Sequence, residues 1–279
     1  MSGVFGAGIV TALEENNAYP LIHNIDAGSA GAINAAYFLA RQSKLGSSIY
    51  WEDLPRGFLR PELIASGVLQ RFCNRYVPEI KINLFHNIID IDFLLDVLEN
   101  KKVLDVNAVI QNHIPLGVKV LDVQDGGIKY LDAKIDTLKV LKASVCAAPY
   151  YFSRERDFID GDIAEPIGID YLLEKNPNHK IVVALNNKPD QGNLLKVRGY
   201  LEGLVAEWMY PGRSIGKLYE KRVEKFMRDV YIAKNEKRVL LVHPPEESPT
   251  GACTRDPIKL RETWEMGRKS ARKILDFIS

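Results

Sequence analysis

Cysteine is scarce in this chain of 279 residues. Its three cysteines, Cys73, Cys146 and Cys253, are odd in number, widely spaced and free of any Cys-x-x-Cys pair. Disulfide scaffolds and cysteine zinc sites depend on paired or closely spaced cysteines, so the pattern argues against both. A reducing compartment fits it best, and we expect a cytoplasmic protein without a bound metal.

The chain also lacks an excess of one charge and a long apolar run. Lysine and arginine number 37 against 36 aspartates and glutamates, which leaves a net charge of +1. Nucleic-acid-binding chains carry a basic excess, so we expect no nucleic-acid partner. No stretch approaches the ~20 apolar residues that cross a bilayer. The apolar residues 3–13 lack a preceding basic segment and run into Glu14, so we expect no signal peptide.

Composition places the chain among globular proteins. Hydrophobic residues make up 46% of it and charged residues 26%, which argues against intrinsic disorder. The length allows one large domain or two small ones, but no repeat, low-complexity tract or Gly/Ser linker divides the chain. We therefore expect a single α/β domain over residues 1–279. Residues 44–90 are expected to form an insertion or cap, and residues 187–279 a helical C-terminal part with one further strand.

Short β-branched runs alternate with amphipathic segments, which is typical of βαβ units and a mostly parallel sheet. Asp125-Gly126-Gly127 is a tight-turn signal and predicts a hairpin. Asp256 and Pro257 mark the start of the last helix as its N-cap and first residue. Strands are expected at 21–26, 118–124, 128–132, 157–159, 180–185 and 239–243. Helices are expected at 8–16, 30–43, 90–100, 105–112, 136–147, 199–209, 214–235 and 257–278.

Residues 24–36 carry the clearest chemical signal. A strand leads into a turn of small residues that carries Ser29, and a helix follows. A nucleophile elbow needs this context, because a serine at a sharp, strained turn leaves no room for bulk two residues before and after it. Ala27 and Gly31 hold those positions, Ala27 being one methyl group larger than the usual glycine. The alternative is that Ser29 only caps the helix. The flanking strand and helix favour a nucleophile, with the positive end of the helix directed at an oxyanion.

Four segments, in this order along the chain, resemble the patatin-like phospholipase family. Residues 3–13 are similar to the end of its glycine-rich loop and the helix behind it, and residues 27–40 to its nucleophile segment. Residues 143–152 resemble its Ala-Ser-x-Ala-x-Pro-x-x-Phe stretch, and residues 158–167 the segment that carries its catalytic aspartate. The match spans about residues 3–186, and the shared order is more specific than any one segment.

The resemblance implies a three-layer α/β/α fold with a mostly parallel central sheet, and a Ser–Asp dyad in place of a triad. Ser29, between Gly28 and the following helix, would be the nucleophile, and Asp160, followed by Gly161, would be the base. Backbone N–H groups would form the oxyanion hole, those of Gly3, Val4 and Ala30. The implied activity is hydrolysis of lipid acyl esters, with peripheral contact to a membrane and no metal or organic cofactor.

The chain departs from the family pattern around the aspartate. Asp162 replaces a small residue after Asp160-Gly161, and its carboxylate would raise the pKa of the dyad aspartate. Asp125-Gly126-Gly127 matches the bare three-residue motif better than the segment at Asp160 does. We still prefer Asp160, because it follows the Ala-Ser…Pro…Phe stretch, whereas Asp125 precedes it inside the expected hairpin.

The N-terminus shows the largest departure from the pattern of the patatin-like family. Met1-Ser2-Gly3 falls on the last three positions of the family's glycine-rich oxyanion loop, Ser2 stands where arginine or lysine is usual, and the first strand is absent. One explanation is a true start further upstream. The other is a truncated chain with a weakened oxyanion hole, since losing one donor typically costs ~10²–10³ in rate. Retention of the rest of the site favours the first.

Two other functions stay open from the sequence. The missing loop, Ala27 and Asp162 would suit a non-catalytic descendant that binds lipid or a protein partner. The order Ser29, Asp160, His243 matches an α/β-hydrolase triad, although a surface histidine at the end of a strand is the favoured interpretation of His243. The other histidines have no metal-binding spacing: His23, His86, His113 and His179.

Residues 212–238 form a basic segment, with nine lysines and arginines against four aspartates and glutamates. Their apolar residues recur at helical spacing: Ile215, Tyr219, Val223, Phe226, Met227 and Val230. A basic amphipathic helix could rest on anionic lipid. The favoured interpretation is an ordinary helix that packs on the core and presents a charged outer face.

Overall fold

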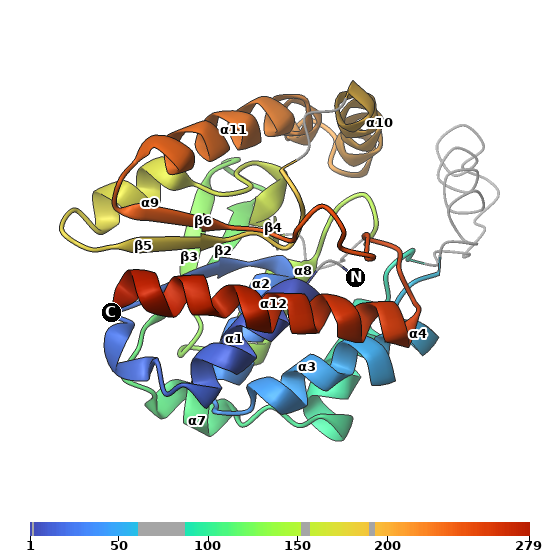
Figure 1. Cartoon of the computed structure of the whole chain (residues 1–279). Coiled ribbons are helices and arrows are strands. Elements are labelled where there is room, and N and C mark those ends of the chain that lie inside the picture. Colours follow the sequence, from blue (N-terminus) through green and yellow to red (C-terminus); the bar gives the residue numbers. More distant parts are fainter. Residues whose placement is uncertain (2, 61–86, 152–156, 190–192) are drawn as a thin grey trace.

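The computed structural model of the chain, drawn in Figure 1, describes residues 1, 3–60, 87–151, 157–189 and 193–279. Several sequence predictions concern residues outside the described ones: Ser2, Cys73, His86, Phe152 and residues 61–86 of the expected insertion.

The protein is a mixed α/β structure in which helices predominate. Its strands are β1 (Ile25–Gly28), β2 (Leu116–Asp122), β3 (Ile128–Asp132), β4 (Phe158–Asp160), β5 (Ile181–Ala184) and β6 (Val239–Val242). Its helices are α1 (Val4–Glu15), α2 (Ser29–Leu39), α3 (Ser43–Glu52), α4 (Leu54–Gly57), α6 (Ile91–Asp96), α7 (Val106–Gln111), α8 (Thr137–Val145), α9 (Ile169–Lys175), α10 (Asn193–Met209), α11 (Ile215–Asn235) and α12 (Pro257–Ile278). Short helical turns are η1 (Tyr19–Leu21), η2 (Val97–Lys101) and η3 (Gly161–Ile163).

Strand β2 is the centre of the larger sheet. On one edge it pairs antiparallel with β3 over Gly117–Leu121. On the other edge it pairs with two strands in succession. Strand β1 runs parallel to it and ends with Gly28 opposite Lys119, whereas β4 runs antiparallel and ends with Asp160 opposite Val120. The ends of β1 and β4 therefore approach each other from opposite directions along the same edge of β2.

The sheet is only partly parallel, which corrects the expected mostly parallel sheet. Strands β5 and β6 pair parallel with each other in a separate two-stranded sheet. The β2–β3 hairpin was predicted correctly from its turn, in which Gly126 has a φ of 71°. The antiparallel direction of β4 was not predicted, because a three-residue strand has no local feature that selects its partner or its direction.

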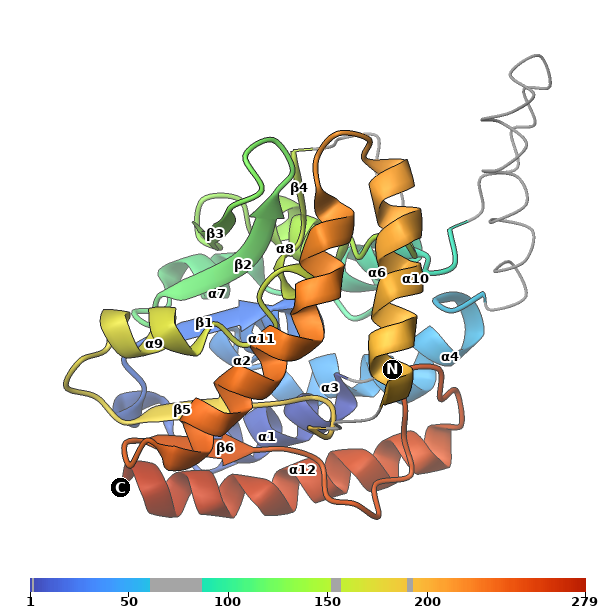
Figure 2. The same ribbon diagram turned by 90° about the horizontal axis from the view of Figure 1, so that it is seen from above.

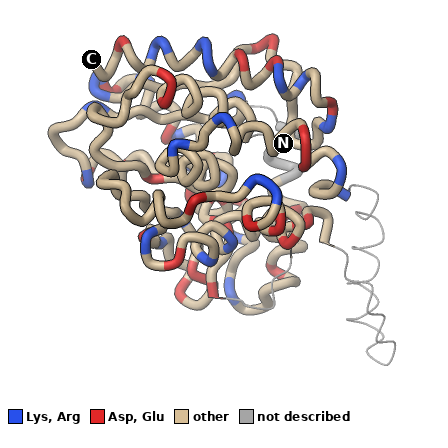
Figure 3. Tube along the Cα trace, turned by 90° about the horizontal axis from the view of Figure 1, so that it is seen from below, with Lys and Arg blue, Asp and Glu red and all other residues tan. Residues whose placement is uncertain are grey.

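The helices lie on both sides of the strands in the view of Figure 1, and Figure 2 gives a second view of the same arrangement. Helices α9, α10 and α11 lie above the strands in Figure 1, and α1, α3 and α12 lie below them. Figure 3 shows lysine and arginine interspersed with aspartate and glutamate along the described chain. Within the described chain, no helix is both long and apolar enough to cross a bilayer.

Helices α1 and α12, from the two ends of the chain, pack in direct backbone contact. A Cβ atom on Gly8 would overlap the carbonyl oxygen of Trp264, and one on Gly267 would overlap the carbonyl oxygen of Phe5. Helix α12 starts as predicted, because the Asp256 side chain accepts a hydrogen bond from the backbone N–H of Ile258. The two glycines thus allow α12 to cover α1.

Helix α11 packs on the core, which confirms the favoured interpretation of the basic segment. Its Val230 and Ala233 are buried in a second apolar cluster with Ile181 of β5 and Val239 of β6. Its lysines and arginines lie mainly on the outer face, as in many surface helices.

Helix α3 occupies part of the segment expected to form an insertion or cap. Ile49 and Tyr50 are buried in the main apolar cluster, so the start of this segment belongs to the core. The sequence also placed the end of the preceding helix too late. Helix α2 ends at Leu39 because Arg41 adopts a left-handed conformation (φ 57°), and its N–H bonds back to Phe38. Glycine usually holds such a position, and an arginine there is not a recognisable stop signal.

We expect Gly8→Ala and Gly267→Ala each to lower the free energy of unfolding by about 1–3 kcal/mol, because a methyl group would push α1 and α12 apart. In an open helix the same change would stabilise by up to ~1 kcal/mol through helix propensity. Urea denaturation followed by circular dichroism measures the difference. Gly251→Ala is the control, since a Cβ there meets nothing within 4 Å. Equal stability of all three variants would contradict the close packing.

Candidate active site

Ser29 lies at a sharp turn between β1 and α2. The strand ends at Gly28, whose backbone is extended, and the helix begins at Ser29 itself. Ser29 has a φ of 50°, a left-handed conformation that is uncommon for a residue with a side chain and is often found at functional sites. The predicted strand–turn–helix is confirmed. Ser29 does not cap the helix, which was the alternative role, because Gly28 is the N-cap of α2 and no side-chain hydrogen bond caps the helix.

Space around the turn is tight at Gly28 but not at Gly31, where the sequence predicted that bulk would be excluded. A Cβ atom on Gly28 would lie 2.6 Å from an Asp162 carboxylate oxygen. A Cβ on Gly31 would lie 4.0 Å from the Cβ of Ala27, which is ordinary van der Waals contact. The extra methyl group of Ala27 therefore fits, and a methyl group at position 31 would fit beside it as well.

Asp160 meets Ser29 where β1 and β4 converge on β2. The Ser29 hydroxyl lies close enough to the Asp160 carboxylate to lower the pKa of that carboxyl, and the carboxylate accepts the backbone N–H of Asp162 at 2.9 Å. Asp160 is 5% exposed, whereas Ser29 is half-buried. The structure thus brings together the two residues that the sequence assigns to a dyad.

The Asp160 carboxyl lies in an environment that disfavours its charge. Burial, and then the negative charge of Asp162, raises the pKa of this carboxyl to about 7. The hydrogen bonds from the Asp162 N–H and from Ser29, and the charge of Arg222, act in the opposite direction without cancelling the rise. The predicted effect of Asp162 is confirmed in direction, although burial is the larger cause.

A second serine holds the backbone of the elbow. The Ser29 N–H donates to the Ser144 Oγ at 2.8 Å, and the Ser144 hydroxyl donates to the carbonyl oxygen of Lys119 at 3.1 Å. Ser144 is fully buried on α8. It lies in the segment that resembles the family's Ala-Ser stretch, but no local pattern assigns it this contact, because its partner is 115 residues away.

Helix α11 covers the carboxylate side of the dyad. Arg222 is close enough to affect the charge of Asp160, and the Tyr219 hydroxyl donates to the carbonyl oxygen of Ala148. Burial raises the pKa of Tyr219 well above its usual value, so this phenol stays neutral beside Asp160. The sequence pattern of this helix indicates only an amphipathic element and gives no sign that Arg222 acts on Asp160.

The helices that carry the expected oxyanion donors start side by side. Gly3 is the N-cap of α1, and a Cβ on it would lie 2.6 Å from the Cβ of Ala30 at the start of α2. Asn34 of α2 ties the two helices together, because its side-chain amide donates to the Gly3 carbonyl at 2.8 Å. First-turn N–H groups of a helix have no partner within the helix. The Ser29 N–H is already bonded, which leaves Ala30, Gly3 and Val4 as the donors to consider.

The rival aspartate, Asp125, lies in the β2–β3 turn. Its carboxylate accepts the Gly127 N–H at 2.7 Å and pairs with Lys129 at 2.8 Å, and about half of its side chain is exposed. Hydrogen bonds from Lys129 and Gly127 hold the pKa of Asp125 below its usual value. Asp125 therefore has a local structural role, and the preference for Asp160 is supported by geometry.

The histidines lie apart from the dyad in the contacts that the structure describes. His243 follows β6 in the separate sheet, and its Nδ1 lies 2.9 Å from the carbonyl oxygen of Pro244. The rings of His23 and His179 pack against each other, with centroids 4.6 Å apart. Among the described residues, no group of three or more histidine, cysteine, aspartate or glutamate side chains has metal-binding geometry.

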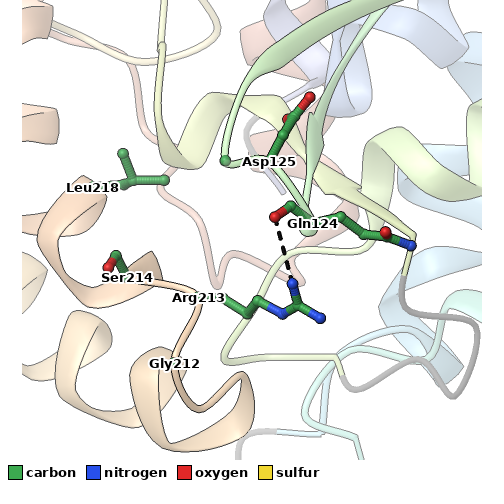
Figure 4. Close-up of a pocket in the computed structure, with 7 residues that line it drawn as sticks. Gln124, Asp125, Gly212, Arg213, Ser214 and Leu218 are labelled. Atoms are coloured by element: carbon green, nitrogen blue, oxygen red, sulfur yellow. Dashed lines mark hydrogen bonds between the residues drawn. The ribbon is translucent and has the colours of Figure 1, made fainter.

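Two surface pockets lie away from Ser29. The pocket in Figure 4 lies between the β2–β3 turn and the loop that joins α10 to α11, where Arg213 donates to the carbonyl oxygen of Gln124 at 3.4 Å. The second is lined by Tyr130, Glu165 and Tyr171 among others. Neither pocket holds a residue of the expected dyad or oxyanion set.

Sequence comparison provides no relative for this chain: no model of a known protein family matches it, and no curated protein matches it in a sequence search. Its function must therefore be argued from the geometry of the site.

The raised pKa of Asp160 predicts a pH-dependent effect of Asp160→Asn on stability. Between pH 4 and 7 the folded protein holds a proton that the unfolded chain has released, so this carboxyl makes the wild type less stable as pH rises through that window. Asparagine does not titrate. We expect the stability of Asp160→Asn relative to the wild type to increase from pH 5 to pH 8.

Thermal unfolding at both pH values measures this change. Asp125→Asn is the control, because the pKa of Asp125 lies below its usual value and this carboxylate stays charged from pH 5 to 8. A relative stability of Asp160→Asn that does not change with pH would show that Asp160 is already ionised at pH 5.

Proposed function

We propose that the protein is a serine hydrolase that cleaves carboxylic esters of lipids with a Ser29–Asp160 dyad. The observation that carries this proposal is the proximity of a strained, half-buried serine to a buried aspartate where two strands meet on one edge of β2. The order of the four segments that resemble patatin-like phospholipases supports it, and with it a patatin-like three-layer α/β/α fold.

In the proposed mechanism, the Ser29 hydroxyl attacks the ester carbonyl and transfers its proton to Asp160. Serine is a weak nucleophile at its own pKa and needs an adjacent base. A base is most effective when its pKa lies near the working pH, and the pKa of Asp160 is about 7. The proton then passes to the leaving alcohol, and an acyl-serine ester remains. Asp160 next takes a proton from water, whose oxygen attacks the acyl carbonyl. The bond between the acyl carbon and the Ser29 Oγ then breaks, Asp160 returns the proton to that oxygen, and the fatty acid is released.

The oxyanion formed in each step needs hydrogen-bond donors beside Ser29. The Ala30 N–H, at the start of α2, would donate to it, as would the N–H groups of Gly3 and Val4 at the adjacent start of α1. Helix starts carry a partial positive charge that favours an anion. The mechanism requires no metal or organic cofactor.

An exposed apolar face on α10 supports a lipid substrate. About half of each of the Tyr200, Leu201 and Leu204 side chains is exposed. On the opposite face of α10, Glu202 is buried and pairs with Arg222 at 3.8 Å, and Arg222 in turn faces Asp160. An exposed apolar surface of this kind suits peripheral contact with a lipid membrane, which would supply the proposed substrate.

One observation favours a second candidate, a non-catalytic module that binds lipid or a protein partner. Neither pocket described above includes Ser29. A binding module would keep the fold and the apolar surface without turnover. Covalent labelling of the serine distinguishes the two candidates.

We expect a fluorophosphonate probe to label wild-type protein at Ser29, and Ser29→Ala to abolish both labelling and hydrolysis of a p-nitrophenyl acyl ester. Asp160→Asn should reduce hydrolysis by about 10²–10⁴-fold, the usual contribution of a general base. Ser48→Ala is the control, because the Ser48 hydroxyl only donates to the Leu45 carbonyl on α3. Absence of labelling would favour the binding module, and loss of turnover in His243→Ala would favour a triad.

The pH dependence of kcat/KM provides an independent check. The base has to be ionised to accept a proton, so hydrolysis should increase with pH as Asp160 loses its proton and level off above about pH 7. An increase centred near pH 4, as for an ordinary aspartate, would contradict the assignment of Asp160 as the base.

A further inference from the structure

Strand β2 places a buried lysine directly behind the dyad. Lys119 is 4% exposed and lies opposite Gly28 in the sheet. Its Cε would lie 3.0 Å from a Cβ on Gly28, and its Cγ 2.7 Å from a Cβ on Gly161. The lysine side chain therefore fits only because both residues that flank it, one beside Ser29 and one beside Asp160, are glycines.

The ammonium group of Lys119 is fully occupied. It donates to the Asp162 Oδ1 at 2.8 Å and to the carbonyl oxygens of Glu165 and Pro166 at 2.6 Å and 3.1 Å. An ammonium has three N–H donors, and three acceptors use them all. These three contacts fix the position of the Lys119 ammonium group.

Asp162 connects this ammonium to the dyad. Its carboxylate pairs with Lys119, and its backbone N–H donates to the Asp160 carboxylate at 2.9 Å. Lys119 also acts on the other side of the dyad, because its carbonyl oxygen accepts the hydroxyl of Ser144, which holds the Ser29 N–H. Both charges are thus fixed by contacts that also fix the geometry of the dyad.

We propose that Lys119 and Asp162 are positioning residues whose paired charges decide whether Asp160 holds a proton, and thereby the pH range in which Ser29 is activated. The effect of this charge pair on catalysis rests on the proposed function, whereas its effect on the protonation of Asp160 does not. The pair allows Asp162 to stand where its carboxylate would otherwise repel that of Asp160 at full strength.

Among the described residues, the other charged or titratable groups next to Asp160 are Arg222 and Tyr219 of α11 and the buried Cys146, whose carbonyl oxygen accepts the Asp160 N–H. Arg222 favours the ionised form of Asp160, and Tyr219 is neutral. Neither contacts Asp162 in the interactions described, so changes at Lys119 and at Asp162 can be compared against a constant background. Removing the lysine charge leaves the Asp162 charge unbalanced, whereas removing the Asp162 charge leaves that of the lysine. The two changes should therefore affect Asp160 in opposite directions.

The test measures the titration of Asp160 directly, by NMR of protein labelled with ¹³C at the aspartate carboxyl carbons. The Asp160→Asn spectrum assigns the signal. We expect Lys119→Met to raise the titration midpoint by about one pH unit and Asp162→Asn to lower it by a similar amount, the usual size for a charge at this range. The double variant should lie between them. Lys129→Met, which removes the same charge from an exposed pair on β3, should leave the midpoint unchanged.

Shifts in the same direction, or no shift in either variant, would overturn the proposal and leave the pair a purely structural role. Lys119→Arg keeps the charge and should restore the wild-type midpoint. Asp162→Asn keeps the backbone N–H to Asp160, so it provides a test even where Lys119→Met fails to fold. The pH profile of hydrolysis is the second measurement. If the two variants shift the Asp160 titration midpoint in opposite directions but the protein shows no hydrolysis and no labelling at Ser29, the role of the Lys119–Asp162 pair is upheld and the proposed function is rejected.

Discussion

The candidate site depends on how two short strands share one edge of β2. Gly28 of β1 pairs with Lys119 and Asp160 of β4 pairs with Val120, so the last residues of the two strands stand next to each other. A slip of one residue in either pairing would turn the side chains to the opposite face of the sheet. The contact between Ser29 and Asp160 therefore depends on the register in which β1 and β4 each pair with β2.

This arrangement brings unfavourable charge into the interior. Asp160 and Asp162 are two residues apart, Asp160 and Lys119 are almost fully buried, and Asp162 is partly buried. Burial disfavours the charged form of a carboxyl group, and a second carboxylate adds to that effect. Stability alone would favour an uncharged residue at position 160. An environment that keeps a carboxyl at a pKa of about 7 is more readily understood as a requirement of acid–base chemistry.

Glycines next to the dyad illustrate how one residue type serves two purposes. Gly28 and Gly161 were expected on the basis of the turn and of the aspartate segment. In the structure both also leave space for the Lys119 side chain, which passes between them. The packing of the lysine explains why bulk is excluded at these two positions, in addition to the shape of the turn at Ser29.

Local signals predicted several elements well. The Asp256-Pro257 start of α12, the Asp-Gly-Gly turn of the β2–β3 hairpin and β3 itself agree with the structure, because caps and tight turns depend on neighbouring residues. Helices α3 and α9 were missed. Helix α3 carries small polar residues, Ser43 and Ser47, on its buried face, and α9 starts after a left-handed Gly168, so neither shows a plain apolar stripe or a cap.

Residue types and their local order identify Ser29 as a serine at a turn between a strand and a helix, whereas Asp160 was selected as its partner through the resemblance of four segments to a known family. They also indicate that Asp162 would oppose the ionisation of that partner. The contacts of Lys119, Ser144 and Arg222 with this site join positions far apart in the chain, and a periodicity or a cap carries no information about them. Those contacts, and the antiparallel direction of β4, follow from packing of the whole chain, since only the folded protein brings these groups within a few ångströms of one another.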